Sequence, residues 1–199
     1  MKYLLYFSFL AFPASVWAQS ANDILMIENY LNNMQSLKAK FVQTASNGTS
    51  SEGSLYISKP SKIRMEYAPP TSILIVGNGE YIVYNDLELD QVTNIDYDDI
   101  PATMILTNDI KIDNNNLKIT DFYKDSGTIS VSLEHTKSED IGPITLVFST
   151  SPFELKQWKI IDPQSVEVTL SLYDVNKDIP VEDNLFKFKN KAKNKRKRR

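Results

Sequence analysis

The stretch Ser72-Ile-Leu-Ile-Val-Gly-Asn-Gly-Glu-Tyr-Ile-Val-Tyr84 decides the fold class of this chain. Two runs rich in β-branched and aromatic residues flank the dipeptide Asn78-Gly79. Asn-Gly suits the positive φ angles of a tight hairpin turn, and the flanking runs suit extended backbone. The stretch therefore predicts two antiparallel strands joined by a short turn.

The same period-two pattern continues on both sides of this hairpin. Turn-forming residues such as Asn47-Gly48 and Lys59-Pro60-Ser61 separate the segments. No interval is long enough for the helical crossover that parallel strands require, so the pattern predicts a single antiparallel meander. We expect strands at 38–46, 52–58, 62–68, 71–77, 80–85, 88–93, 117–124, 127–135, 143–149, 153–161, 165–174 and 184–188.

Two segments have helical rather than extended periodicity. Apolar residues recur at helical spacing from Ile24 to Met34, after the candidate N-cap segment 20–23, and predict an amphipathic helix over 22–37. Pro101 begins a second, shorter segment, 101–107, and proline is common in the first turn of a helix. Both helices have apolar residues to pack onto the sheet.

The N-terminal residues are typical of a cleavable secretory signal. Lys2 precedes the apolar run 3–12, which is too short to span a bilayer, and Val16 and Ala18 suit the site that a signal peptidase recognises. We expect residues 1–18 to be removed before Gln19. The exported product, a single domain over residues 19–188, is then expected in the periplasm.

The sequence offers little for catalysis or metal binding. The chain has no cysteine, which excludes disulfides and thiolate chemistry, and no Gly-x-Ser-x-Gly motif accompanies the lone histidine, His135. The acidic run 96–99 lacks the spaced ligands of a calcium loop, and residues 113–116 are typical of a plain loop. We predict no catalytic residue, no metal and no cofactor, although paired carboxylates of a hydrolase have no sequence signature that would reveal them.

Charge divides the chain into an acidic body and a basic end. Residues 187–199 contain nine of the 22 cations and no acid, so residues 19–186 carry a net charge near −13. Secretion and an acidic body both argue against nucleic acid as a partner. Two interpretations of the tail over 189–199 stay open: a disordered, solubilising extension, or a segment that docks at anionic membrane surfaces.

Several segments of the chain resemble those of a known family, the outer-membrane lipoprotein carriers (LolA). The matching pieces follow the family's order along almost the whole chain after residue 37. They are Phe41-Val-Gln43, Gly53-Ser-Leu-Tyr-Ile-Ser-Lys-Pro60, Arg64-Met-Glu-Tyr67, Ile73-Leu-Ile-Val-Gly-Asn-Gly79, Leu89-Asp-Gln-Val-Thr93, Pro101-Ala102, Leu155-x-x-Trp158-x-Ile-x-Asp162 and Asn184-Leu-Phe186-x-Phe188. The last two resemble the family's closing strands.

The resemblance implies a fold and a function. The fold would be mainly β with an α lid: a single incomplete antiparallel β-barrel, covered by short helices around an apolar cavity. The function would be a monomeric periplasmic carrier of acylated lipoproteins, from an inner-membrane lipoprotein-releasing transporter to an outer-membrane lipoprotein receptor. The family commonly has arginine where this chain has Lys59, and often an aromatic residue at the position of Met65. The basic tail also departs from the family pattern.

Strand alternation places the candidate site residues independently of the family. Leu55 and Ile57 share one face of their strand with Lys59, so Lys59 is predicted to point inward at the rim and to donate to helix-end carbonyls. A turn lysine in water is the alternative, and Arg64 is a second candidate for holding the lid. The predicted acyl-chain cavity consists of Ile24, Ile27, Leu31, Met34, Leu55, Ile57, Ile63, Met65, Tyr67, Met104 and Ile105.

Other functions are compatible with the same sequence. Flexible methionines can adapt to chains of variable shape, but they also fill gaps in ordinary cores. A different lipid-binding or envelope-sensing protein could use the same half-barrel. A secreted hydrolase is the alternative from another class, and a cavity lined by apolar residues without converging acids would exclude it.

Overall fold

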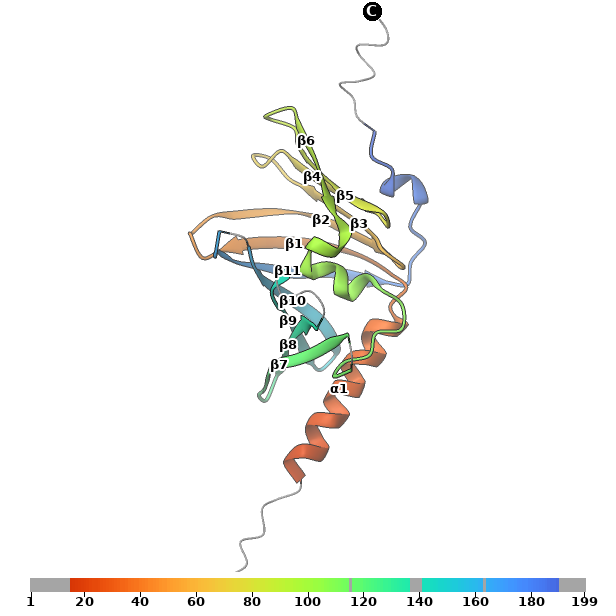
Figure 1. The fold of residues 1–199 in the computed structure, drawn as a ribbon, viewed down its shortest axis with the longest axis vertical. Coiled ribbons are helices and arrows are strands. Elements are labelled where there is room, and N and C mark those ends of the chain that lie inside the picture. Colours follow the sequence, from red (N-terminus) through yellow and green to blue (C-terminus); the bar gives the residue numbers. More distant parts are fainter. Residues whose placement is uncertain (1–14, 115, 137–140, 163, 190–199) are drawn as a thin grey trace, which may run out of the picture.

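One open, eleven-stranded antiparallel sheet forms the body of the protein (Figure 1). The computed structural model describes residues 15–114, 116–136, 141–162 and 164–189. The strand order is β6-β5-β4-β3-β2-β1-β11-β10-β9-β8-β7, so the first and last strands pair in the middle, and β6 and β7 are free edges. The sheet is curved but does not close, which confirms the incomplete antiparallel barrel.

The strands follow the period-two segments closely. Strands that follow one another in the chain pair as hairpins, except for β6 and β7, which a long connection joins. The bounds are β1 Ser36–Ala45, β2 Ser50–Ser58, β3 Lys62–Tyr67, β4 Ile73–Asn78, β5 Tyr81–Asp86, β6 Gln91–Asp96, β7 Leu117–Lys124, β8 Thr128–His135, β9 Ile144–Thr150, β10 Phe153–Ile161 and β11 Glu167–Lys177. Eleven of the twelve predicted strands are thereby confirmed.

The prediction of a strand at 184–188 is wrong. Asp183–Phe186 forms a short 3-10 helix, η4, because β11 already pairs with β1 on one side and β10 on the other, which leaves no neighbouring edge for another strand. The chain instead passes over the outside of β3 and β4. We call residues 178–189 the C-terminal segment.

The predicted N-terminal helix is present but ends earlier than expected. Helix α1 spans Ser15–Asn33 instead of ending at residue 37, because Ser36 and Leu37 already pair with Ser58 and Ile57 in the sheet. The predicted cleavage point before Gln19 lies inside this helix, and residues 1–14 lie outside the described part of the chain. None of the helices in the described ranges is long and apolar enough to cross a membrane.

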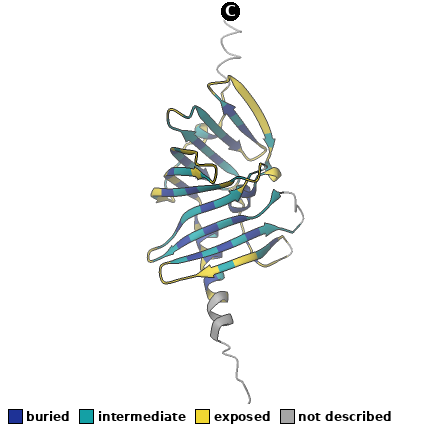
Figure 2. Cartoon of the chain, turned by 90° about the vertical axis from the view of Figure 1, so that its left-hand side faces the viewer, coloured by how far each residue is buried: buried dark blue, intermediate teal, exposed yellow. Residues whose placement is uncertain are grey.

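The connection from β6 to β7 covers the rest of the concave face. It contains two 3-10 helices, η1 Tyr97–Asp99 and η2 Pro101–Leu106, and Pro101 stands in the first turn of η2 as predicted. Buried side chains of α1, η2 and the concave sheet face form one hydrophobic core. Figure 2 shows the result on the strands, where buried and less buried positions alternate along most of the sheet.

Candidate functional site

The concave face of the sheet is the surface that the predicted cavity residues share. Leu55 and Ile57 of β2 lie opposite Met65 and Ile63 of β3, so all four side chains point to the same side. They belong to one hydrophobic core together with buried residues of α1 and η2. Among the predicted residues, those at most 1% exposed are Ile27, Leu31, Met34, Leu55, Ile57 and Ile105, whereas Ile63, Met65 and Met104 are 5–8% exposed.

Two predicted cavity residues lie at the margin of this core. Ile24 and Tyr67 are half-buried and pack against it. The Tyr67 hydroxyl donates a hydrogen bond to Oε1 of Gln43 at 2.7 Å, and its ring meets the ring of Phe41 edge-on. Burial raises the pKa of Tyr67, so its hydroxyl remains a donor at neutral pH.

The apolar concave face is therefore covered by α1 together with η2 and the chain that follows it. Side chains of Ile27, Leu31 and Met34 occupy the place where the sequence predicted space for a ligand. The structure corresponds to a closed arrangement, in which the apolar face of the sheet meets an apolar face of the helix.

Lys59 lies at the C-terminal end of α1. Its Nζ donates a hydrogen bond to the backbone oxygen of Leu31 at 2.7 Å, as the strand alternation suggested. Leu31 belongs to the last turn of α1, where helical carbonyls lack partners within the helix and attract cations. Burial lowers the pKa of Lys59 from its usual 10.5 to about 8.

The turn over residues 59–61 also bonds to the residues after α1, to η2 and to η1. The backbone nitrogen of Lys59 donates to the oxygen of Gln35 at 2.8 Å, and the nitrogen of Ser61 donates to the oxygen of Leu106 at 2.9 Å. The Tyr97 hydroxyl donates to the oxygen of Ser61 at 2.9 Å. Residues 59–61 thus join the ends of α1 and η2 and the start of η1 at one point.

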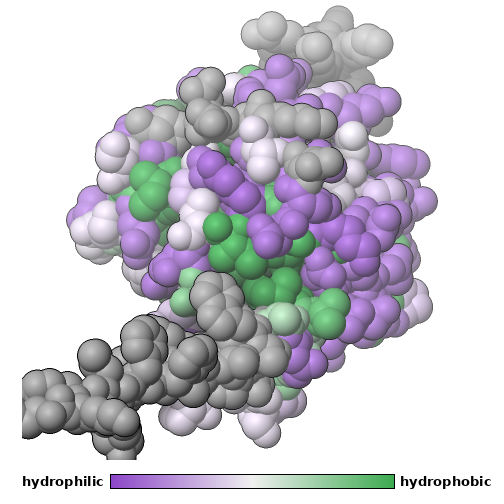
Figure 3. Space-filling model, turned by 60° about the horizontal axis from the view of Figure 1, so that its bottom comes forward, coloured by the Kyte–Doolittle hydropathy of each residue, from purple (hydrophilic) through white to green (hydrophobic). Residues whose placement is uncertain are grey.

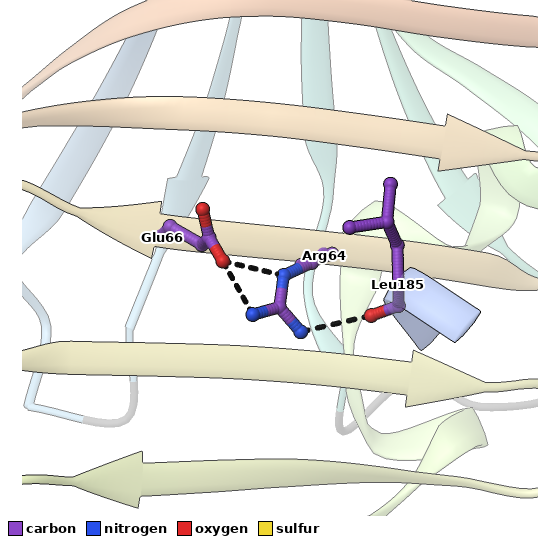
Figure 4. A network of polar contacts seen from close by, with 3 residues as sticks. All are labelled: Arg64, Glu66 and Leu185. Carbon is purple, nitrogen blue, oxygen red and sulfur yellow. Dashed lines mark hydrogen bonds and ion pairs between the residues drawn. The ribbon is translucent and has the colours of Figure 1, made fainter. Parts of the chain in front are cut away.

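Arg64 does not lie at the lid. It shares the convex face with Glu66, to which it is ion-paired, and its Nη1 donates to the backbone oxygen of Leu185 at 2.8 Å (Figure 4). The prediction that Arg64 could hold the lid fails on geometry, because Arg64 is one residue out of phase with the inward-facing Ile63 and Met65. Arg64 fastens the C-terminal segment instead.

A second set of polar contacts, spread along α1, was not predicted from the sequence. Both carboxylate oxygens of Asp23 accept hydrogen bonds from Nζ of Lys124 in β7, at 2.8 Å. Glu28 accepts from the nitrogen of Ile112 at 2.6 Å. Asn32 binds both the nitrogen and the oxygen of Ile110, at 2.6 and 2.8 Å.

A signal for one of these residues was present in the sequence. Lys124 shares a face with Phe122 on β7, as Lys59 continues the face of Ile57, but the bulge between Ile119 and Asp121 puts it out of phase with Leu117 and Ile119, so alternation over the whole strand hid it. The partners on α1 gave no such signal, because a carboxylate on a helix is usually solvated. Only the fold shows that Asp23 is 2% exposed and Glu28 is 8% exposed.

The described residues contain no group of three His, Asp or Glu side chains that could hold a metal. His135 lies at the end of β8, as predicted. A groove of about 550 Å³ lies on the outside of the sheet beside the C-terminal segment, between residues such as Arg64, Asn85 and Phe188. It does not coincide with the predicted cavity, and its lining is mixed in polarity.

Comparison with known proteins supplies the family. The family model described as outer membrane lipoprotein carrier protein LolA matches residues 32–189. The chain is 26% identical to an outer-membrane lipoprotein carrier protein of Pseudomonas aeruginosa (strain UCBPP-PA14) over 194 residues, covering 92% of each chain. It is 27% identical to an uncharacterized protein of Rickettsia prowazekii (strain Madrid E) over 193 residues, covering 96% of this chain and 89% of the relative.

Solved structures agree on the fold. An uncharacterized conserved protein from Thermus thermophilus superposes with a TM-score of 0.51 at 13% identity, covering 87% of this chain and 97% of that one. A DUF1329 family protein from Desulfovibrio piger superposes with a TM-score of 0.51 at 8% identity, covering 85% and 96%. Identity this low supports the fold alone. The match of the family model over most of the chain decides the family: the protein belongs to the LolA family of outer-membrane lipoprotein carrier proteins.

Proposed function

We propose that the protein carries the acyl chains of lipoproteins on the concave face of its sheet, with α1 as the movable cover. One observation carries this proposal: α1 lies on an apolar, curved sheet face and is held there in part by polar bonds, including that from Lys59 to Leu31. Family membership supports a carrier-like, non-enzymatic role. The carrier would exchange one apolar partner of the sheet, α1, for another, the acyl chains.

The energetics favour such an exchange. Burying each methylene group of an acyl chain stabilises the complex by about 0.8 kcal/mol, so two or three long chains amount to tens of kcal/mol. Opening exposes the apolar stripe of α1, including Ile27 and Leu31, and breaks its polar bonds. That cost offsets part of the gain. A carrier benefits from the offset, because cargo bound with the full gain would not be released.

The proposed setting is the periplasm, reached through the predicted leader over residues 1–18. Lipoproteins would arrive from an inner-membrane transporter and leave to an outer-membrane receptor, as the resemblance to the carrier family suggests. The basic residues from Lys187 onward would assist at anionic membrane surfaces. Residues 190–199 of this tail lie outside the described residues.

Displacement of an apolar fluorescent probe tests the proposal. A diacylated peptide should displace the probe from the folded protein, whereas the same peptide without acyl chains should not. Equal displacement by both peptides would refute an acyl-chain site. Loss of the near-UV circular dichroism signal would reveal any unfolding by the acylated peptide.

A further inference from the structure

Two strands of the sheet end their inward rows in the same way. In β7, Leu117, Ile119 and Phe122 face the core, and Lys124 follows on the same side, after a bulge between Ile119 and Asp121. The cross-strand partner of Lys124 is Ile129, which is 1% exposed in the core. Lys124 therefore occupies on β7 the position that Lys59 occupies after β2, at the rim of the concave face.

Lys124 of β7 reaches the N-terminal half of α1. Its ammonium group binds both oxygens of the Asp23 carboxylate at 2.8 Å. The Asp23 side chain is 3% exposed, and the Lys124 side chain is 34% exposed. A carboxylate this deeply buried depends on its partner, because a buried charge without one is costly. The pair therefore favours the closed position of this part of the helix.

The two ends of α1 differ in their freedom to move. Only two residues, Met34 and Gln35, separate the C-terminal end of α1 from β1, and Gln35 is bonded to the backbone of Lys59. That end stays attached to β1, so it is the point about which α1 would turn. The N-terminal half is farther from this attachment, so rotation about the C-terminal end would displace Asp23 more than Leu31.

The surface next to Asp23 is suited to apolar chains. Ile24 of α1 and Ile119 and Phe122 of β7 are half-buried at the margin of the core, and Leu25 is 55% exposed. Figure 3 shows apolar side chains gathered beside the start of the helix. Because β7 is an edge strand, separating α1 from it breaks no hydrogen bond within the sheet.

From this geometry we infer that acyl chains enter and leave between the N-terminal half of α1 and the edge strand β7, and that Asp23 and Lys124 close this entrance. The inference rests on the proposed carrier function and adds the route and the positioning residues to it. Lys59 stabilises the closed position of the C-terminal end of α1, and the Asp23–Lys124 pair stabilises the closed position of its N-terminal half.

Bridging the entrance tests the route. The chain has no cysteine, so Asp23→Cys combined with Lys124→Cys can be joined by a short bis-maleimide without side reactions at other thiols. The matched control joins Lys118→Cys and Glu134→Cys, which replace an ion pair between β7 and β8 that does not involve α1. The measured quantity is the uptake rate of a fluorescent dipalmitoylated peptide before and after bridging.

The inference predicts that bridging positions 23 and 124 stops uptake and that bridging positions 118 and 134 leaves it unchanged. Equal uptake by the bridged and unbridged forms of the first variant would overturn the entrance while leaving the carrier function intact. Failure of the unmodified protein to bind the peptide would instead overturn the proposed function, and the entrance with it.

A single substitution provides an independent arm that does not depend on the cysteine variants folding. Asp23→Asn removes the charge that Lys124 binds, and a charged hydrogen bond of this kind corresponds to roughly a tenfold change in an equilibrium. Uptake by the Asp23→Asn protein should be about tenfold faster. Lys118→Gln, on the same strand as Lys124, should leave the rate unchanged. An unchanged rate with Asp23→Asn would contradict the inference.

Discussion

Lys59 shows at the scale of one residue how an apolar row can end in a cation. Its side chain follows the inward direction of Leu55 and Ile57 and therefore reaches a region of low polarity. Its acceptor, the oxygen of Leu31, belongs to a helix end, where the last carbonyls lack helical partners. The bond satisfies both groups only when α1 is in place, so it couples a charge on the sheet to the position of the helix.

The lowered pKa of Lys59 predicts a pH dependence of opening. The closed form holds Lys59 at a pKa of about 8, and the open form would return it to its usual 10.5. Between these values the open form binds more protons, so raising the pH shifts the equilibrium toward the closed form. Probe affinity, followed by fluorescence titration, should therefore fall as the pH rises from the lower of these two pKa values to the higher.

Lys59→Arg supplies the control for this titration. Arginine stays protonated throughout the interval, so the part of the pH dependence that Lys59 causes should vanish. A pH profile identical in the two proteins would show that another group titrates.

Replacing Lys59 with leucine should separate loading from delivery. Lys59→Leu leaves the backbone oxygen of Leu31 without its donor in the closed form, and an unsatisfied buried acceptor costs roughly 1–3 kcal/mol, which shifts the balance toward the open form about tenfold. The variant should accept lipoprotein normally from inner-membrane vesicles but transfer it poorly to an outer-membrane acceptor, because closure no longer assists release. Lys59→Arg should retain both steps. Normal delivery by Lys59→Leu would mean that the bond does not contribute to release.

Single residues mark the limit of prediction from sequence. Alternation along a strand was sufficient to place Lys59 and the core positions of β2 and β3, because side-chain direction in a strand is a local property. The partner of each lysine was not predictable, because Leu31 and Asp23 approach through long-range packing. Arg64 was assigned to the wrong contact, because no local pattern in the sequence indicates that the C-terminal segment lies against the outside of β3.

At the scale of the elements, the close packing of β2 against β1 and β3 depends on a glycine. A Cβ atom at Gly53 would lie 2.3 Å from the backbone oxygen of Glu66 and 2.6 Å from Cζ of Phe41. Gly53→Ala should therefore destabilise the protein by about 1–3 kcal/mol in urea unfolding, as overpacked cores do. Gly127→Ala is the control, because nothing lies within 4 Å of its added atom. Equal stabilities of the two variants would contradict the close packing of Phe41 over Gly53.

The C-terminal segment is the element that strand periodicity misassigned. Alternating apolar residues from Leu185 to Phe188 resemble a strand, yet Phe186 packs on the outside of the sheet and is 2% exposed. Lys62 pairs with Asp183 at 2.7 Å at the start of the same contact. Periodicity identifies an apolar face of a segment. It cannot tell whether the segment pairs with an edge strand or packs against the surface of a sheet.

Phe186→Ala should separate stability from cargo handling. The loss of a buried phenylalanine should lower the free energy of unfolding by about 3 kcal/mol. Because Phe186 lies on the convex side, probe uptake at low temperature should keep its rate as long as the protein remains folded. Phe188→Ala, which removes a half-buried ring from the same segment, should cost less. A changed uptake rate for folded Phe186→Ala protein would place this segment in the lid mechanism.

The whole molecule is one open sheet, in which each strand pairs with two neighbours except the edge strands β6 and β7. Local patterns predicted its strands and their antiparallel order, because most neighbours in the sheet are also neighbours in the chain. The pairing of β1 with β11 is not local. It joins the two halves of the sheet, so that α1 can contact both β7 and the turn after β2. The filled concave face was also beyond the sequence, since the same apolar stripe on α1 suits a ligand cavity or a packed core.

The central claim is that cargo chains replace α1 on the concave face, and site-specific photo-cross-linking in cells tests it most directly. A photoreactive amino acid at Ile57 would face the interior, whereas the same group at the adjacent Tyr56 would face outward. Mass spectrometry of the adducts then identifies what each position contacts. The account predicts acyl chains of lipoproteins cross-linked at position 57 and not at position 56. Lipoprotein adducts at position 56 alone, or only cross-links within the chain at position 57 while lipoproteins are transported, would contradict it.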